Sequence, residues 1–154
     1  MADVIEVAEY ILELTGAVTT MKLQKLAYFT QARFLVQNDS PLFANRIEAW
    51  ANGPVIPDLF AWHRGKFMIG PGELLGPPYS SATLSSAEKD AARKVVAALG
   101  GRSGEELRLL THSEKPWLDA RVGYAPGEKC GEEITVAAML SFYSSPECAN
   151  QAVR

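Results

Sequence analysis

Hydrophobic side chains recur at helical spacing along most of the chain, which predicts a mainly α-helical protein. A first amphipathic helix is expected over residues 3–14, since Asp3 suits an N-cap and Gly16 suits a stop. Over residues 20–37, apolar side chains fall on more than one face and little of the helix surface is purely polar. A helix of this kind belongs near the centre of a fold.

Turn residues divide the rest of the chain into shorter elements. Residues 47–51 have the branched and aromatic content of a short strand, which Gly53 and Pro54 then end. Two Ser-x-x-Glu sequences, starting at Ser85 and Ser103, fit capping boxes that open helices. Helices are expected over residues 57–66, 85–99, 103–113 and 132–143, with one more short turn opened by Pro116. The pattern predicts a compact, single-domain helical bundle around a central hydrophobic helix, with at most a short β-element near residues 46–51.

Residues 65–85 are rich in Gly and Pro but also carry apolar side chains, so they predict a long loop that is not hydrophilic. Loops of this length are commonly lids or binding loops. Phe67 and Met68 would mark a contact site if they are exposed; the alternative is that the loop is strapped over the core. On the preceding helix, Trp62 is the best candidate for an exposed aromatic side chain, whereas His63 is expected to be packed rather than a ligand.

Composition narrows the class of protein. The chain has 154 residues, 47% of them hydrophobic and 21% charged, which fits one folded domain. A net charge of −3 gives no electrostatic reason to expect tight nucleic-acid binding. The sequence contains neither a secretory signal nor an apolar run of about 18 residues, so no membrane partner and a cytoplasmic location are expected. We expect a domain over residues 1–146 and a loose tail over residues 147–154, which could be disordered.

Residues that could carry chemistry are few. Cys130 and Cys148 do not form a Cys-x-x-Cys pair and have no nearby histidine, so reduced thiols are expected rather than a metal site. His112 with Glu114 would suit acid–base work, but no motif supplies a nucleophile, and a structural role at the helix end is the stronger interpretation. No cofactor is predicted.

The two lysines of the central helix raise a different question. Lys22 and Lys25 flank Leu23, so one of them should approach the core, where an amine needs a carboxylate or carbonyl partner. An internal ion pair with Glu48 or Glu13 is the first interpretation, and a lysine that faces a binding partner is the second. Candidates for partner binding are Lys22, Trp62, Phe67 and Met68.

Three motifs occur in order along the chain: Lys-Leu-Gln-Lys-Leu-x-Tyr from Lys22, Glu-Ala-Trp-x-x-Gly-Pro-Val from Glu48, and Thr-His-x-x-x-Pro-Trp from Thr111. Together they resemble the Panacea antitoxin domain family, also called the SocA-like or GepA-like family, which is phage-associated. The resemblance covers nearly the whole chain. The residues that carry it, taken as mainly structural, are Leu23, Gln24, Lys25, Leu26, Tyr28, Trp50, Gly53, Pro54, His112, Pro116 and Trp117.

The resemblance implies a small, non-enzymatic antitoxin without a cofactor or a metal. It would neutralise a cognate protein toxin by binding it directly or by delivering it to a cellular protease. Two alternatives stay open. A nucleic-acid-binding regulator would have to concentrate cations on one side, and the candidates are Lys22, Lys25, Arg33 and Arg46. A small hydrolase using His112 is the weaker alternative.

Overall fold

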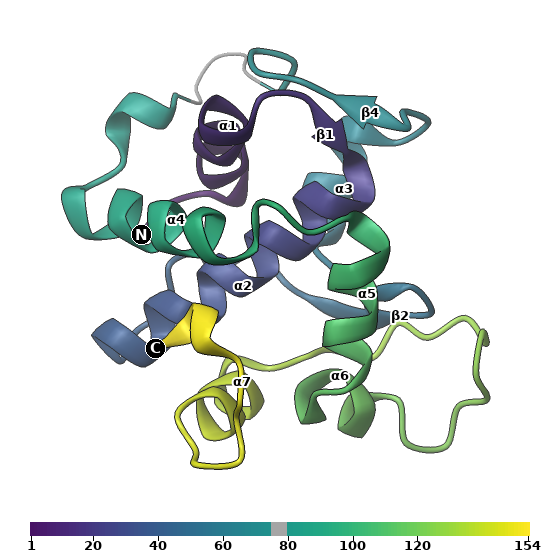
Figure 1. The fold of residues 1–154 in the computed structure, drawn as a ribbon. Coiled ribbons are helices and arrows are strands. Elements are labelled where there is room, and N and C mark those ends of the chain that lie inside the picture. Colours follow the sequence, from purple (N-terminus) through teal and green to yellow (C-terminus); the bar gives the residue numbers. More distant parts are fainter. Residues whose placement is uncertain (75–79) are drawn as a thin grey trace.

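Helix α2 (Thr20–Asn38) runs through the middle of the molecule in the computed structural model, which describes residues 1–74 and 80–154 (Figure 1). The helices that pack around it are α1 (Val4–Thr15), α4 (Ser86–Leu99), α5 (Gly104–His112) and α7 (Val136–Tyr143). Apolar and polar side chains of α2 are buried together, from Leu23 and Phe29 to Gln24, Lys25 and Gln31. The mainly helical bundle around a central helix is therefore confirmed.

Local sequence signals set the helix boundaries. The Asp3 side chain accepts a hydrogen bond from the amide of Ile5, and Glu6 reaches back to the amide of Asp3, which completes a capping box at the start of α1. Gly16 ends that helix with a φ of 73°, a conformation that favours glycine. The capping boxes expected at Ser85 and Ser103 are also present.

A β-hairpin lies beside α2. Strand β2 (Glu48–Trp50) pairs antiparallel with β3 (Gly53–Val55), so the expected strand exists, but Gly53 and Pro54 continue the hairpin instead of ending it. The segment before α7 borders the other edge of β2, because Glu132 accepts from the Ala49 amide at 2.9 Å and the Ile134 amide donates to Ile47 at 2.8 Å. These bonds keep residues 132–134 extended, and α7 begins at Val136 rather than at the expected residue 132.

The long segment after α3 (Pro57–His63) is partly ordered by pairing. Strand β4 (Met68–Ile69) pairs with β1 (Val18–Thr19), and a short 3-10 helix spans Ser81–Thr83. Ile69 and Leu74 are buried, whereas Phe67 and Met68 are exposed. The described part of this loop thus straps the core and also presents apolar side chains; residues 75–79 of the predicted loop lie outside the described residues.

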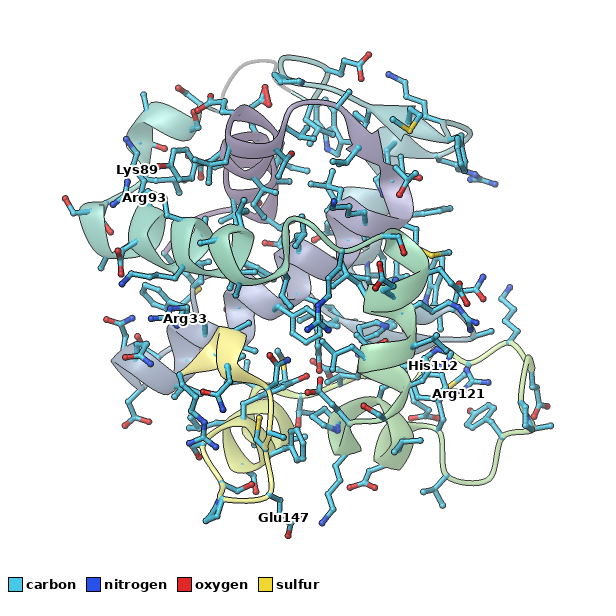
Figure 2. All side chains as sticks on the ribbon, viewed as in Figure 1. Arg33, Lys89, Arg93, His112, Arg121 and Glu147 are labelled. Atoms are coloured by element: carbon cyan, nitrogen blue, oxygen red, sulfur yellow. The ribbon has the colours of Figure 1, made fainter. Side chains whose placement is uncertain are left out.

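The C-terminal segment packs against α2, where a loose tail was expected. A short 3-10 helix, Gln151–Val153, places Ala152 and Val153 in the core. Arg33 Nη1 donates to the carbonyls of Ala152 at 3.2 Å and Arg154 at 2.6 Å, and Figure 2 shows Arg33 beside this end of the chain. Two buried apolar side chains and an arginine on a distant helix help to hold the segment, and none of these contacts is evident from the local sequence.

Helix α6 (Lys115–Ala120) is the short turn predicted after Pro116. Figure 1 shows a long loop that leaves α6 and returns to α7 at the lower edge of the molecule. Within residues 1–74 and 80–154, no helix combines the length and the apolar character needed to cross a membrane.

Candidate binding pocket and surface

Gln24 ties α2 to the junction between β3 and α3. Its Oε1 accepts from the Ile56 amide at 2.9 Å, and its Nε2 lies 3.0 Å from Nε2 of the buried His63. Because Oε1 is already an acceptor, the amide nitrogen is the atom that faces His63, so His63 Nε2 accepts and its ring proton sits on Nδ1. Burial lowers the pKa of His63, which agrees with a neutral ring. His63 is packed, as expected.

Lys25 is almost fully buried, with 1% of its surface exposed, and its Nζ donates to the Pro54 carbonyl at 3.2 Å. The prediction of an internal ion pair with Glu48 or Glu13 is wrong. Glu48 instead accepts from Trp50 and Arg46, and Glu13 accepts from a serine hydroxyl, so neither carboxylate reaches the amine. Burial and, secondarily, the charge of Arg108 lower the pKa of Lys25 to about 7.

Gly53 makes room for this lysine. A Cβ atom at Gly53 would lie 2.6 Å from Lys25 Cε, closer than non-bonded atoms tolerate, and 3.0 Å from Thr111 Oγ1, which is a tight contact. Gly53 also has a φ of 112°, a region that side chains rarely adopt. The glycine of the second motif is thus in contact with the lysine of the first and the threonine of the third.

A cavity of about 470 Å³ opens beside these residues. Trp50 and Phe60 form an edge-to-face pair on its wall, with ring centroids 5.1 Å apart. Cys130, a buried free thiol as expected, also lines it. The full lining is Thr20, Met21, Gln24, Lys25, Glu48, Trp50, Ala51, Asn52, Val55, Phe60, His63, Gly127, Lys129, Cys130 and Gly131.

Arg121 fixes the loop that forms one side of the cavity, a role that was not predicted. Its guanidinium donates to the carbonyls of Ala49 at 2.9 Å, Ala125 at 3.1 Å and Glu128 at 2.7 Å. It also lies over the ring of Trp117, 5.2 Å from the centroid. A single arginine after a short helix carries no sequence signal for this role, because all its acceptors are backbone carbonyls.

His112 and Glu114 are not brought together as a catalytic pair. His112 stacks on Trp117 with centroids 3.8 Å apart, and its Nε2 is buried without a hydrogen-bond partner among the described residues. Figure 2 shows His112 beside Arg121, where α5 meets α6. Glu114 bonds to Tyr143 and Asn150 instead. His112 therefore packs against the turn at the end of α5 by stacking on Trp117.

Trp50 and Trp117 are both half-buried. The indole of Trp117 donates to the Trp50 carbonyl at 2.8 Å, and the indole of Trp50 donates to Glu48. Each ring therefore has its polar atom satisfied while one edge stays accessible, and Trp50 uses that edge to line the cavity.

Among the predicted partner-binding residues, Lys22 has an internal partner, since its Nζ donates to the Gly100 carbonyl at the end of α4 at 2.6 Å. The other three side chains are exposed: Trp62 by 43%, Phe67 by 77% and Met68 by 48%. We call these three residues the apolar patch. The backbone of Phe67 lies next to a residue of the cavity, because the amide of Thr20, a lining residue, donates to the Phe67 carbonyl at 2.9 Å.

The structure is a small, mainly helical domain with a pocket beside α2 and exposed apolar side chains on and after α3. Residues 23–118 match the family described as antitoxin SocA-like, Panacea domain, and the chain belongs to this family. It is 30% identical over 114 residues to antitoxin SocA of Caulobacter vibrioides (strain NA1000 / CB15N). That alignment covers 65% of this chain and 58% of the relative's length. No solved structure matches the chain. The family expected from the three motifs is confirmed.

Proposed function

We propose that this protein is an antitoxin that neutralises a cognate protein toxin, either by binding it directly or by delivering it to a protease. Membership of the SocA-like family carries the proposal. In both mechanisms the antitoxin must hold the toxin on its own surface. The proposal assigns the chemistry to the partner and only binding to this chain.

The apolar patch is the surface that we assign to this contact. Phe67 and Met68 stand on the strand-and-loop segment after α3, and Trp62 stands on α3 itself. Aromatic and methionine side chains are enriched at protein interfaces, which favours these three exposed residues as contact residues.

The four cations considered as a nucleic-acid-binding set all make contacts within the molecule. Lys25 is buried, Lys22 bonds to the end of α4, and Arg33 holds the C-terminal segment. Arg46 pairs with Glu48 at 2.9 Å and with Glu133 at 3.1 Å. Binding to nucleic acid depends on cations that are available to phosphates, so the positions of these four side chains favour a protein partner.

The hydrolase alternative is also weaker than the binding proposal. A general base must lie within hydrogen-bond reach of a nucleophile or a water in a site that a substrate can enter. His112 is not among the residues that line the cavity, and stacking on Trp117 covers one face of its ring.

Co-expression with the product of the adjacent gene tests the proposed function. Growth rescue and a complex that co-purifies from a protease-deficient host would support direct neutralisation. Rescue that disappears when a protease is deleted would support delivery. A neighbour that is not toxic and forms no complex would contradict the antitoxin function at this locus.

The double substitution Phe67→Ser/Met68→Ser is expected to weaken toxin binding about tenfold or more, because it removes two exposed apolar side chains from the contact. Folding should be nearly unchanged, since substitutions of exposed residues usually shift stability by at most about 0.5 kcal/mol. Binding is measured by calorimetry and folding by thermal melting. Leu118→Ser is the matched control: Leu118 is 43% exposed, on α6, far from β4 in Figure 1. Equal binding by the two variants would exclude the apolar patch as the contact.

A further inference from the structure

The cavity beside α2 has the size and lining of a small-molecule site. Its volume of about 470 Å³ lies within the range of about 300 to 1,000 Å³ that ligand pockets occupy. Trp50, Phe60 and Val55 give it apolar walls. Walls of this kind favour a flat apolar body of one or two rings, which can lie against the aromatic side chains.

Lys25 places a buried cation at this cavity, and its ammonium group still has hydrogen bonds to donate. An ammonium group has three donors, and the described structure uses one, on the Pro54 carbonyl. Gln24 and His63 also line the cavity, but they bond to each other, and Gln24 bonds to the Ile56 backbone as well. No carboxylate within residues 1–74 and 80–154 forms an ion pair with Lys25.

The surrounding charges also favour an anion. Within residues 1–74 and 80–154, the titratable groups around Lys25 include Arg108 and His112 on α5, His63 on α3, Glu48 on β2, and Lys129 and Cys130 in the loop that lines the cavity. Burial lowers the pKa of both histidines, so neither adds charge at neutral pH. The carboxylate of Glu48 is balanced by Arg46. One unpaired ammonium matches a single carboxylate, because a phosphate would bring more charge and more acceptors than it can satisfy.

We propose that this pocket binds a small organic carboxylate, with the carboxylate accepting hydrogen bonds from Lys25 Nζ and an apolar ring lying against Trp50 and Phe60. The ligand supplies the counter-charge that the chain does not provide, so Lys25 is the residue that selects an acid over its neutral analogue. Because Gly53 has no side chain, there is room for Lys25 Cε beside it in the interior. The proposed ligand site does not depend on toxin binding, so each of the two proposals can be tested without the other.

Binding of an acid here is coupled to a proton. Burial lowers the pKa of Lys25 to about 7, and a bound carboxylate would raise it again by favouring the charged amine. The ligand should therefore bind the protonated form, which is abundant at pH 6 and scarce at pH 8. Affinity is expected to fall about tenfold between these two pH values, with uptake of close to one proton per ligand at pH 8.

Calorimetric titration of the full chain with benzoate, phenylacetate and indole-3-acetate, each paired with its carboxamide, tests this inference. At least one acid should bind at pH 6 with an affinity about tenfold or more above its amide. Titration in buffers of different ionisation enthalpy gives the proton uptake. Amide and indole NMR signals of Gln24, Trp50 and Cys130 should shift on binding, since these residues line the pocket.

Lys25→Met should abolish the preference for acids and the pH dependence, while keeping an unbranched side chain in the core. Lys94→Met makes the same substitution at an exposed position of α4 that does not line the cavity, and should change neither. The inference is overturned if no acid binds at millimolar concentration, if acids and amides bind alike, or if wild type and Lys25→Met show the same pH dependence. Thermal melting checks that both variants fold.

Discussion

Gly53→Ala is expected to lower the free energy of unfolding by about 4 kcal/mol, from backbone strain and overpacking together. The strain arises because Gly53 has a φ of 112°. The overpacking arises because the new Cβ would lie 2.6 Å from Lys25 Cε and 3.0 Å from Thr111 Oγ1. Moving Lys25 Cε away from the new Cβ would disturb the hydrogen bond from Lys25 Nζ to the Pro54 carbonyl. Urea unfolding followed by circular dichroism measures the loss.

Gly65→Ala separates the two contributions. Gly65 has a φ of 85°, but a Cβ added there would meet no atom within 4 Å, so only the strain of about 1 to 2 kcal/mol should appear. Combining Gly53→Ala with Lys25→Ala removes one clashing partner, and the double variant should be more stable than the sum of the single losses predicts. A Gly53→Ala loss no larger than that of Gly65→Ala would show that the contact between Gly53 and Lys25 does not constrain the fold.

The features that could be predicted from the sequence are those set by neighbouring residues. Capping boxes at Ser85 and Ser103 span three residues each, and both mark helix starts correctly. The apolar residues on every side of α2 likewise predicted its central position. In each case, the residues that determine the helix start or its burial are close together in the sequence, so they can be recognised from the sequence alone.

The features that were missed depend on partners far away in the sequence. Lys25 could be expected near the core, but which acceptor it finds is settled by the hairpin that brings Pro54 over it. The sequence likewise could not show that Arg121 holds the loop beside the cavity, or that Val153 is buried against α2. In the sequence, residues 132–134 look like the start of a helix, but in the structure their backbone pairs with β2 and stays extended. The first two motifs therefore contain several of the pocket's residues without revealing that they form a pocket.

Glu114 forms a buried polar network that should make stability depend on pH. Its side chain is buried, with Oε1 2.8 Å from Tyr143 Oη and Oε2 3.2 Å from Asn150 Nδ2. Tyr143 Oη also lies 3.0 Å from Tyr28 Oη. Burial raises the pKa of Glu114 from 4.5 to about 7, and the bonds from Tyr143 and Asn150 offset only part of that rise.

The direction of the stability change with pH follows from which state of the chain, folded or unfolded, holds the proton. Below pH 4.5 Glu114 is protonated in both the folded and the unfolded chain, so it adds no pH dependence. Between pH 4.5 and about 7 the folded chain keeps a proton that the unfolded chain has lost. Stability then falls by about 1.4 kcal/mol per pH unit, or about 3 kcal/mol in total, and levels off above that range. Burial raises the pKa of Tyr28, Tyr143 and Cys148, so these neighbours stay neutral throughout.

Glu114→Gln is expected to remove this loss and to be more stable than the wild type by about 3 kcal/mol at pH 8, with little difference at pH 5. The amide can replace the protonated acid, with its oxygen accepting from Asn150 and its nitrogen donating to Tyr143. Urea unfolding at pH 5, 6, 7 and 8 gives the free energy of unfolding of both proteins. In the difference between them, the contributions of Lys25 and the other titratable groups that they share cancel. Glu147→Gln, at an exposed ion pair with Lys115, is the matched control and should run parallel to the wild type. Parallel curves for Glu114→Gln would mean instead that the buried carboxyl is ionised at no net cost, with Tyr143 and Asn150 fully compensating for its burial.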